Sequence, residues 1–219
     1  MNQPPSMPAN AERRRLRRVM RARRRALDAR AQRRAAAGLA EVLSCALRHP
    51  WPHRIAFYLA RDGEIDPDLT VTPLAERGCS LFLPRIDPLR GGSDRLRFTP
   101  FEPAMAMRRN RLGIPEPDTS HTVPPWTLDV VLMPLVAFDR RGGRLGMGGG
   151  FYDRSFSALR PRPRQPLLIG IAHSIQEVER VPTAQHDVPL DGIATERDVH
   201  WVSQRVTRRS AARRKGPRS

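Results

Sequence analysis

The stretch LDVVLMPLVAFDRRGGRLGMGGGFYDR, residues 128–154, decides the fold and the place of the functional site. It opens with a dense apolar run, residues 128–137, which predicts a buried strand. Pairing should be interrupted at Pro134, because proline cannot donate to a sheet ladder. A glycine-rich loop follows, and residues 152–159 have the pattern of a helix. A strand, a loop and a helix in this order are typical of the ligand-binding edge of an α/β sheet.

Outward from this stretch, short apolar runs alternate with helical patterns along the chain. They predict further strands at residues 54–59, 79–83, 96–98, 167–172 and 192–195. Two amphipathic helices are predicted before Pro50, with Asn10 as a cap, and a third between residues 66 and 78. The proline-rich residues 100–127 are expected to form a long surface loop.

This alternation predicts an α/β fold, because buried parallel strands need helices on both faces. We expect a single domain over residues 10–204, a three-layer sandwich whose central sheet is mostly parallel and is flanked by helices. Residues 1–9 and the basic tail, residues 205–219, are expected to be disordered.

The positive charge is concentrated at the two ends of the chain. The 219 residues include 39 Lys+Arg and 22 Asp+Glu, a net charge of +17. Residues 13–34 contain twelve arginines and one acid, and residues 205–219 add seven basic residues, so the remainder sums to −1. We expect most arginines in residues 13–34 to lie on solvated helix faces. The basic ends also keep a nucleic-acid or other polyanion partner open as an alternative.

Several classes of protein are excluded by composition. Lys215, in the tail, is the only lysine, so the body has no lysine for Schiff-base chemistry or a Walker A loop. The longest apolar run has nine residues, too few to cross a bilayer. Cys45 and Cys79 are far apart and outside any metal-ligand spacing, which indicates two buried, reduced thiols in a cytoplasmic protein.

The segment from Asp139 to Asp153 carries the chemistry. Glycines let backbone N–H groups approach an anion closely, and a following helix adds a favourable dipole. Arg144 offers a planar cation suited to phosphate oxygens, and Asp153 is placed to hold magnesium. The pattern is neither GxGxxG nor Walker A, so a glycine-rich hairpin without a ligand remains the alternative from pattern alone.

Residues 128–154 closely resemble the signature of the 5-formyltetrahydrofolate cyclo-ligase family. The resemblance spans residues 13–198, because further elements follow in order: R-x-x-L-R at 13–17, FYLARDGEID at 57–66, GIPEP at 113–117, LIGIAHSIQ at 168–176 and VPTAQHDVPLDGIATE at 181–196. The arginine-rich start is also similar to a mitochondrial transit peptide, but the matched element at 13–17 argues against its removal.

The resemblance implies a ligase that uses ATP and Mg²⁺ to cyclise 5-formyltetrahydrofolate to 5,10-methenyltetrahydrofolate. The family phosphorylates the formyl oxygen, so that ADP and phosphate are released. The implied partners are ATP and the folate, with or without a polyglutamate chain, and no membrane. A cytoplasmic monomer is expected. A related fold that kept the ATP loop but changed its substrate stays open beside the polyanion alternative.

The resemblance also implies site residues. Arg144 and Glu64 would be catalytic, and Asp153 and Asp187 would hold magnesium. The ATP-binding set is Arg13, Arg17, Arg144, Leu145, Gly146, Met147, Gly148, Gly149, Gly150, Phe151 and Tyr152. The folate-binding set is Leu59, Glu64, Leu112, Met147 and Phe151. Relatives often carry an aromatic residue at Leu112 and a lysine at Arg13, so this chain departs from the family pattern at both positions.

Overall fold

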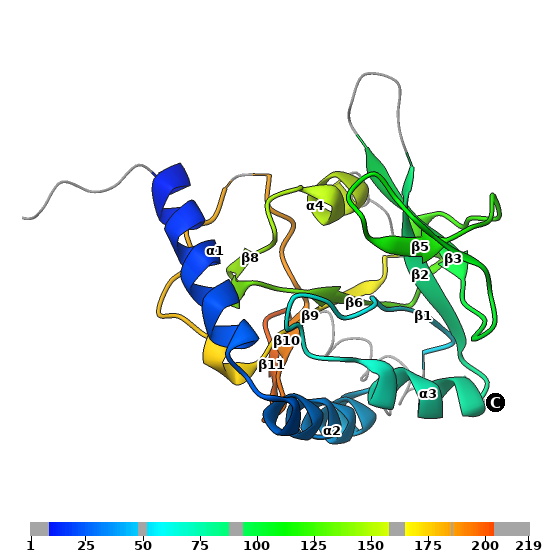
Figure 1. Ribbon diagram of the computed structural model, residues 1–219, viewed down its shortest axis with the longest axis horizontal. Helices are drawn as coiled ribbons and strands as arrows, with labels where there is room; N and C mark the ends of the chain where they lie inside the picture. Colours follow the sequence, from blue (N-terminus) through cyan, green and yellow to red (C-terminus); the bar gives the residue numbers. More distant parts are fainter. Residues whose placement is uncertain (1–8, 48–51, 88–93, 158–164, 185, 204–219) are drawn as a thin grey trace, which may run out of the picture.

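The computed structural model describes residues 9–47, 52–87, 94–157, 165–184 and 186–203 (Figure 1). The helices are α1 (Ala9–Arg25), α2 (Ala29–Ala46), α3 (Asp68–Glu76) and α4 (Phe151–Phe156), with 3-10 turns η1 (Pro125–Thr127) and η3 (Ser174–Gln176). The strands are β1 (Arg54–Ala56), β2 (Ser80–Asp87), β3 (Arg95–Pro100), β4 (Met107–Arg109), β5 (Pro115–Pro117), β6 (Val130–Pro134), β7 (Ala137–Phe138), β8 (Arg144–Leu145), β9 (Leu167–Ile171), β10 (Gly192–Ala194) and β11 (Val199–Trp201).

Seven of these strands form the central sheet, in the order β11-β10-β9-β6-β1-β2-β3. The five inner strands run parallel, with Ile55 beside Val130 and Val130 beside Leu167. β3 and β11 close the two edges in antiparallel pairing. The sheet is therefore mostly parallel, as expected, and its buried strands are the apolar runs seen in the sequence.

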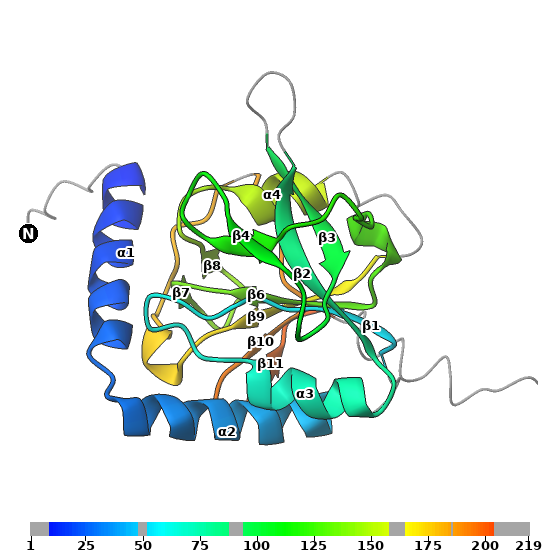
Figure 2. The same cartoon turned by 45° about the vertical axis from the view of Figure 1, so that its right-hand side comes forward.

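Alternate residues of the strands feed two separate cores, which makes the molecule three layers. Leu132 and Ile169 point to the face covered by α2 and α3, whereas Val131 and Leu168 point to the face covered by α4. Figure 2 shows α2 and α3 beneath the sheet and α4 above it. The three-layer α/β sandwich predicted from the sequence is confirmed.

The N-terminal helices form where the apolar spacing predicted them. α2 begins at an N-cap, Asp28, whose side chain accepts a hydrogen bond from the Ala31 N–H at 2.7 Å. Its apolar stripe, including Leu39 and Leu43, is fully buried against the sheet. α1 packs against the glycine-rich hairpin rather than against the sheet, through Leu16, Val19 and Met20.

Several sequence expectations are corrected by the structure. The run 128–137 is interrupted at Pro134, as expected, because β6 ends there. The rest of the run does not resume this strand: residues 137–138 pair with β8 in a separate hairpin. Residues 100–127 contain the β4–β5 hairpin and η1 and are not simply a loop. α1 already begins at Ala9, so Asn10 lies inside the helix and is not its cap.

Further expectations concern the helix after the glycine-rich loop, the two cysteines and membrane spans. The helix predicted over 152–159 is α4, Phe151–Phe156, and residues 158–164 lie outside the described residues, as do most of the two termini. Cys45 is exposed rather than buried, whereas Cys79 is buried, as expected, and its thiol donates to Pro52 O at 3.0 Å. Among the residues that the structure describes, no helix is long and apolar enough to span a bilayer.

Candidate active site

The candidate site lies at the carboxyl edge of the parallel strands, under α1. The segments that follow β1, β6 and β9 all emerge at this edge, because parallel strands end on the same side. They carry residues 57–64, the glycine-rich loop and residues 172–188. Figure 1 shows α1 standing beside this edge, with β8 next to it.

Four arginines of α1 face the site, and we call them the arginine ladder: Arg13, Arg17, Arg21 and Arg24. Their spacing of four, four and three residues places them on one side of a helix. Each one contacts a loop at the carboxyl edge of the sheet. The expectation that most arginines of residues 13–34 are solvated holds for the eight outside the ladder, which are exposed. Arg13, Arg17 and Arg21 are half-buried, and Arg24 is completely buried.

The first two arginines of the ladder bind the two loops that carry the predicted phosphate and metal residues. Arg13 grips the Asp187 carboxylate with both guanidinium Nη atoms, at 2.9 and 3.3 Å, and donates to Pro182 O at 2.9 Å. Arg17 donates from Nε to Gly146 O at 2.9 Å. Burial and the neighbouring Arg13 lower the pKa of Arg17, so the two cations are close to each other.

The glycine-rich loop leaves the β7–β8 hairpin with its backbone exposed. Asp139 fixes the hairpin by accepting from the N–H groups of Arg141, Gly143 and Val181 at 2.8–2.9 Å. Gly148 has a φ of 102°, which other residues rarely adopt, and a Cβ added to it would lie 3.5 Å from the Arg17 guanidinium carbon. The following helix, α4, has only six residues, so it contributes less dipole than the sequence suggested.

Arg144 and Asp153 form one buried charged unit. Arg144 on β8 donates to the Asp153 carboxylate and, from Nε, to Val188 O at 3.0 Å. The same Asp153 oxygen accepts the Val188 N–H at 2.9 Å. The unit joins the glycine-rich loop to the segment that carries Asp187, so the four predicted residues Arg13, Arg144, Asp153 and Asp187 come together.

Two carboxylates here suit magnesium only with help from a substrate. Within the described residues, no group of three or more His, Cys, Asp and Glu side chains could enclose a metal ion. Magnesium commonly takes one or two carboxylates together with substrate phosphates and water. Burial opposes ionisation of Asp187, but hydrogen bonds from Arg13 and the Ala184 N–H outweigh it and lower its pKa. The donor set of Asp153 and Asp187 therefore fits a cation that arrives with phosphate.

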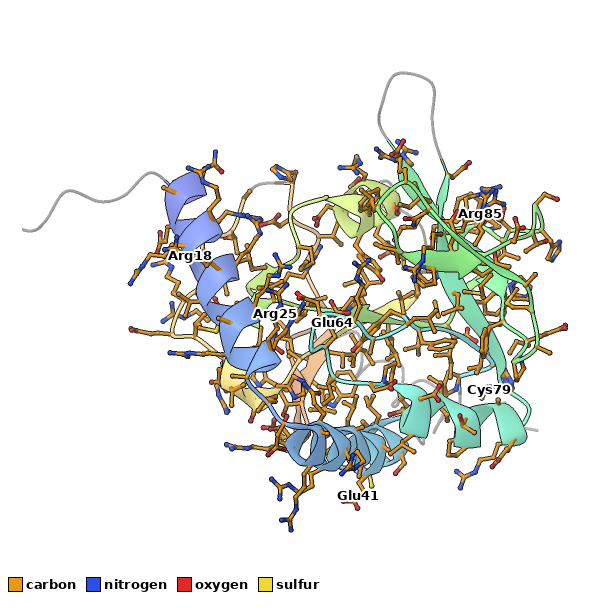
Figure 3. All side chains as sticks on the ribbon, in the orientation of Figure 1. Arg18, Arg25, Glu41, Glu64, Cys79 and Arg85 are labelled. Atoms are coloured by element: carbon orange, nitrogen blue, oxygen red, sulfur yellow. The ribbon has the colours of Figure 1, made fainter. Side chains whose placement is uncertain are left out.

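Glu64 lies on the other side of the glycine-rich loop, in the interior between α1 and the strands (Figure 3). Its side chain is 7% exposed, and its oxygens accept from Arg24 Nη2 at 3.5 Å and from the Arg61 N–H at 3.2 Å. Burial raises the pKa of Glu64, and the charge of Arg24 opposes that rise. Burial and the charge of Glu64 also raise the pKa of Tyr152, so the Tyr152 phenol lies close enough to feel the Glu64 charge.

Apolar side chains are exposed around this carboxylate. Leu59 and Met147 are 36% and 49% exposed, respectively, which is unusual for large hydrophobic residues. Phe151 and Tyr152 begin α4; the Arg154 guanidinium covers the Phe151 ring at 5.2 Å, and Tyr152 stacks on Phe156. Leu112 comes from a separate element and is exposed on the turn between β4 and β5. The remaining predicted residues, Leu145, Gly146, Gly149 and Gly150, belong to β8 and the loop that leads into α4.

Comparison with known proteins decides the family. A profile of the 5-formyltetrahydrofolate cyclo-ligase family matches residues 9–196. The chain belongs to this family. The 5-formyltetrahydrofolate cyclo-ligase of Escherichia coli K12 is 40% identical over 145 residues, which cover 65% of this chain and 78% of that protein. The mouse enzyme of the same name is 24% identical over 192 residues, 85% of this chain and 95% of that protein.

Solved structures agree on the fold. The Aquifex aeolicus 5,10-methenyltetrahydrofolate synthetase has a TM-score of 0.71 and 27% identity, covering 94% of this chain and 95% of that chain. The Mycoplasma pneumoniae synthetase has a TM-score of 0.67 and 26% identity, over 87% and 99% of the two chains. The cyclo-ligase resemblance and the ligase class inferred from the sequence are confirmed.

Sequence reasoning missed two residues that the structure brings to this candidate site, Arg24 and Asp62. Asp62 accepts hydrogen bonds from Arg21, Arg24 and Arg25 and has a φ of 56°. The dipeptide Asp62-Gly63 is a turn signal that points to such a conformation. Arg24 also carried a signal, because it continues the apolar spacing of Leu16 and Met20 along α1.

Proposed function

We propose that this cyclo-ligase closes the N5-formyl group of 5-formyltetrahydrofolate onto N10, with conversion of ATP to ADP and phosphate. The observation that carries the proposal is the convergence of Arg13, Arg17 and Arg144 with Asp153 and Asp187 at one loop, beside Glu64 and its apolar neighbours. The arginines and the two aspartates suit a polyphosphate with its metal ion. Glu64 and its apolar neighbours suit a flat, partly apolar ring.

The formamide oxygen is a poor leaving group, which is why the reaction needs ATP. The oxygen attacks the γ-phosphorus and the bond to ADP breaks, giving an N5 iminium phosphate. N10 then attacks the formyl carbon, a C–N bond forms, and phosphate departs with the C–O electrons and the N10 proton. The product is the 5,10-methenyl cation. No nucleophilic side chain is required, so the protein contributes positions and charge.

The arginines of the site have different roles in the proposed reaction. Arg144 and Arg17 stabilise charge on the transferring phosphoryl group, and Arg13 orients the Asp187 carboxylate. Asp153 and Asp187 would hold Mg²⁺, which would supply positive charge against the phosphates. Leu145, Gly146, Gly148, Gly149 and Gly150 present backbone to the phosphates. Glu64 accepts N–H groups of the pterin, and Leu59, Met147, Phe151 and Leu112 supply its apolar walls. The cytoplasmic location, the monomeric state and the polyglutamate preference stay predictions.

The test is direct. The chain is mixed with 5-formyltetrahydrofolate, ATP and magnesium, the ultraviolet band of the methenyl product is followed, and ADP is counted. One ADP for each methenyl product, and no product without ATP, are expected. A flat trace from folded protein would sink the proposal.

A second candidate function, polyanion binding, is supported by the exposed side of α1. Arg14, Arg15 and Arg18 are exposed there, and none of them forms an ion pair with the acids that the structure describes. Replacing all three by glutamine should lower the salt slope of oligonucleotide binding by about 0.7–0.9 for each lost phosphate contact, with turnover unchanged. Deleting residues 205–219 should act in the same direction. An unchanged slope in both variants would remove this candidate.

A further inference from the structure

Arg24 is the one arginine of the ladder whose guanidinium is wholly removed from solvent. Its five contacts reach three separate segments. Nε donates to Asp62 O at 2.8 Å, Nη1 to Leu135 O at 3.2 Å, and Nη2 to Asp62 Oδ2 at 2.7 Å, with Glu64 Oε1 at 3.5 Å and Met147 Sδ at 3.8 Å. A cation is rarely buried unless it is paired and hydrogen-bonded on every side.

The loop that carries Glu64 is held against α1 from both sides. Asp62 and Gly63 are consecutive left-handed residues, and a Cβ on Gly63 would lie 2.9 Å from Arg24 O, so only glycine permits this close approach. From the opposite side, His173 contacts Gly63 O through Nε2 at 3.1 Å. A carbonyl oxygen can only accept, so the ring nitrogen that faces Gly63 O is the protonated one.

Leu135 O links this loop to the end of β6. It accepts from Arg24 and also from Gln176 Nε2, at 2.8 Å. A shift of the guanidinium would therefore move the loop that carries Glu64 and release a carbonyl at the start of the glycine-rich segment. Glu64 was assigned to the folate side of the site, and Met147 to both the folate-binding and the ATP-binding sets.

We infer that Arg24 is a positioning residue, which fixes Glu64 and Met147 on the folate side of the site. The inference rests on the proposed function and names a residue through which that function sets folate affinity. The phosphate side is held separately, because Arg13, Arg17 and Arg144 bind Asp187, Gly146 and Asp153, none of which touches Arg24.

The charges that face Glu64 decide the pH dependence. They are Arg24 from α1, Arg61 and Asp62 from its own loop, Tyr58 after β1, and Tyr152 from α4. Burial raises the pKa of both tyrosines, so at neutral pH neither carries charge. Arg24 is thus the nearest buried cation, and removing an opposite charge at this distance raises a carboxyl pKa by about 1–3 units.

The experiment compares Arg24→Met, which keeps length without charge, with Arg24→Lys, and uses Arg23→Met as the matched control. Arg23 is the exposed neighbour on the same helix. For folded Arg24→Met we expect the folate KM to rise about tenfold and the ATP KM to stay within about twofold. In the plot of kcat/KM for the folate against pH, the acidic limb should move to higher pH. Arg23→Met should match the wild type. A folate KM and profile like those of the wild type would overturn the inference.

Two further measurements separate positioning from simple structural loss. In a double-mutant cycle with Glu64→Gln, the effect of Arg24→Met on folate KM should largely disappear, because Arg24 acts through that carboxylate. Additive effects would contradict it. If Arg24→Met does not fold, Arg24→Lys carries the test, because one ammonium cannot replace the fork of contacts; its folate KM should rise about threefold. An unchanged KM would overturn the inference.

A substrate-free readout keeps this inference distinct from the proposed function. Glutamate carboxyl groups are labelled with ¹³C, the Glu64 signal is assigned with Glu64→Gln, and its titration is followed. The Glu64 midpoint should be higher in Arg24→Met than in the wild type, and an equal midpoint in folded protein would refute the link. Absence of methenyl product from the wild type would instead refute the proposed function and leave this titration to decide the role of Arg24.

Discussion

Asp62 is expected to contribute stability that depends on pH. Burial opposes ionisation of this carboxyl, but hydrogen bonds from Arg21, Arg24 and Arg25 outweigh it and lower its pKa from 3.8 to about 2. A folded pKa below the unfolded one means that the contribution is complete above pH 4 and is lost as pH falls toward 2. At 1.36 kcal/mol per unit, the shift corresponds to about 2 kcal/mol at pH 7 and roughly half of that at pH 3.

The perturbation is Asp62→Asn. Asparagine tolerates the left-handed conformation that Asp62 adopts at a φ of 56°, so the substitution removes charge without adding backbone strain. Urea unfolding at pH 7 should show a loss of about 2 kcal/mol, and the gap to the wild type should shrink to about 1 kcal/mol at pH 3.

The matched control is Asp118→Asn. Asp118 is 55% exposed and pairs with the half-exposed Arg108 at 3.6 Å, so we expect a change below about 0.5 kcal/mol at either pH. A similar loss for both variants, or a gap for Asp62→Asn that does not narrow at low pH, would refute the view that three arginines stabilise the Asp62 carboxylate.

Three further predictions concern ligands. Arg144→Ala should lower kcat/KM by at least about 100-fold in the methenyl assay, whereas Arg140→Ala, at the exposed Arg140–Glu177 pair, should leave it unchanged; equal values would deny Arg144 its role. Gly148→Ala and Gly78→Ala should each lose about 1 kcal/mol of stability, because both glycines have positive φ, but only Gly148→Ala should raise the ATP KM; a rise in both would point to a general effect. Leu112→Trp should lower the folate KM about threefold by restoring an aromatic wall, and a KM that does not fall would show that Leu112 does not face the pterin.

The layers of this fold could be read from the sequence because its strands are buried on both faces. Residues 167–171 and 130–133 are continuous apolar runs, and such runs are typical of inner parallel strands. β11 was missed because its Val199–Trp201 alternates weakly and is only half buried, and the β4–β5 hairpin because proline borders β5 on both ends. Edge strands and hairpin strands are stabilised by pairing with a neighbouring strand, and the sequence pattern of the strand alone does not show which neighbour that is.

The candidate site, like the fold, could be predicted only in part from the sequence. Motif resemblance identified Glu64, Arg144, Asp153 and Asp187. The fold then brings the loops of Glu64 and Asp187, strand β8 with Arg144 and helix α4 with Asp153 to one edge of the sheet. The resemblance did not predict that Arg144 pairs with Asp153 or that Arg13 pairs with Asp187. Each of these ion pairs joins two different elements, which only the folded chain brings together. Arg24 was hidden among twelve arginines in residues 13–34, and only its helical phase with Leu16 and Met20 separates it from them.

In the proposed reaction ATP activates the formyl oxygen, and no nucleophilic side chain is required. The most direct test uses 5-formyltetrahydrofolate labelled with ¹⁸O in the formyl group, with ATP, magnesium and a single turnover of enzyme. The account predicts that methenyl product forms only with ATP and that the label appears in the released phosphate. Methenyl product with unlabelled phosphate, or no product from folded protein, would contradict it.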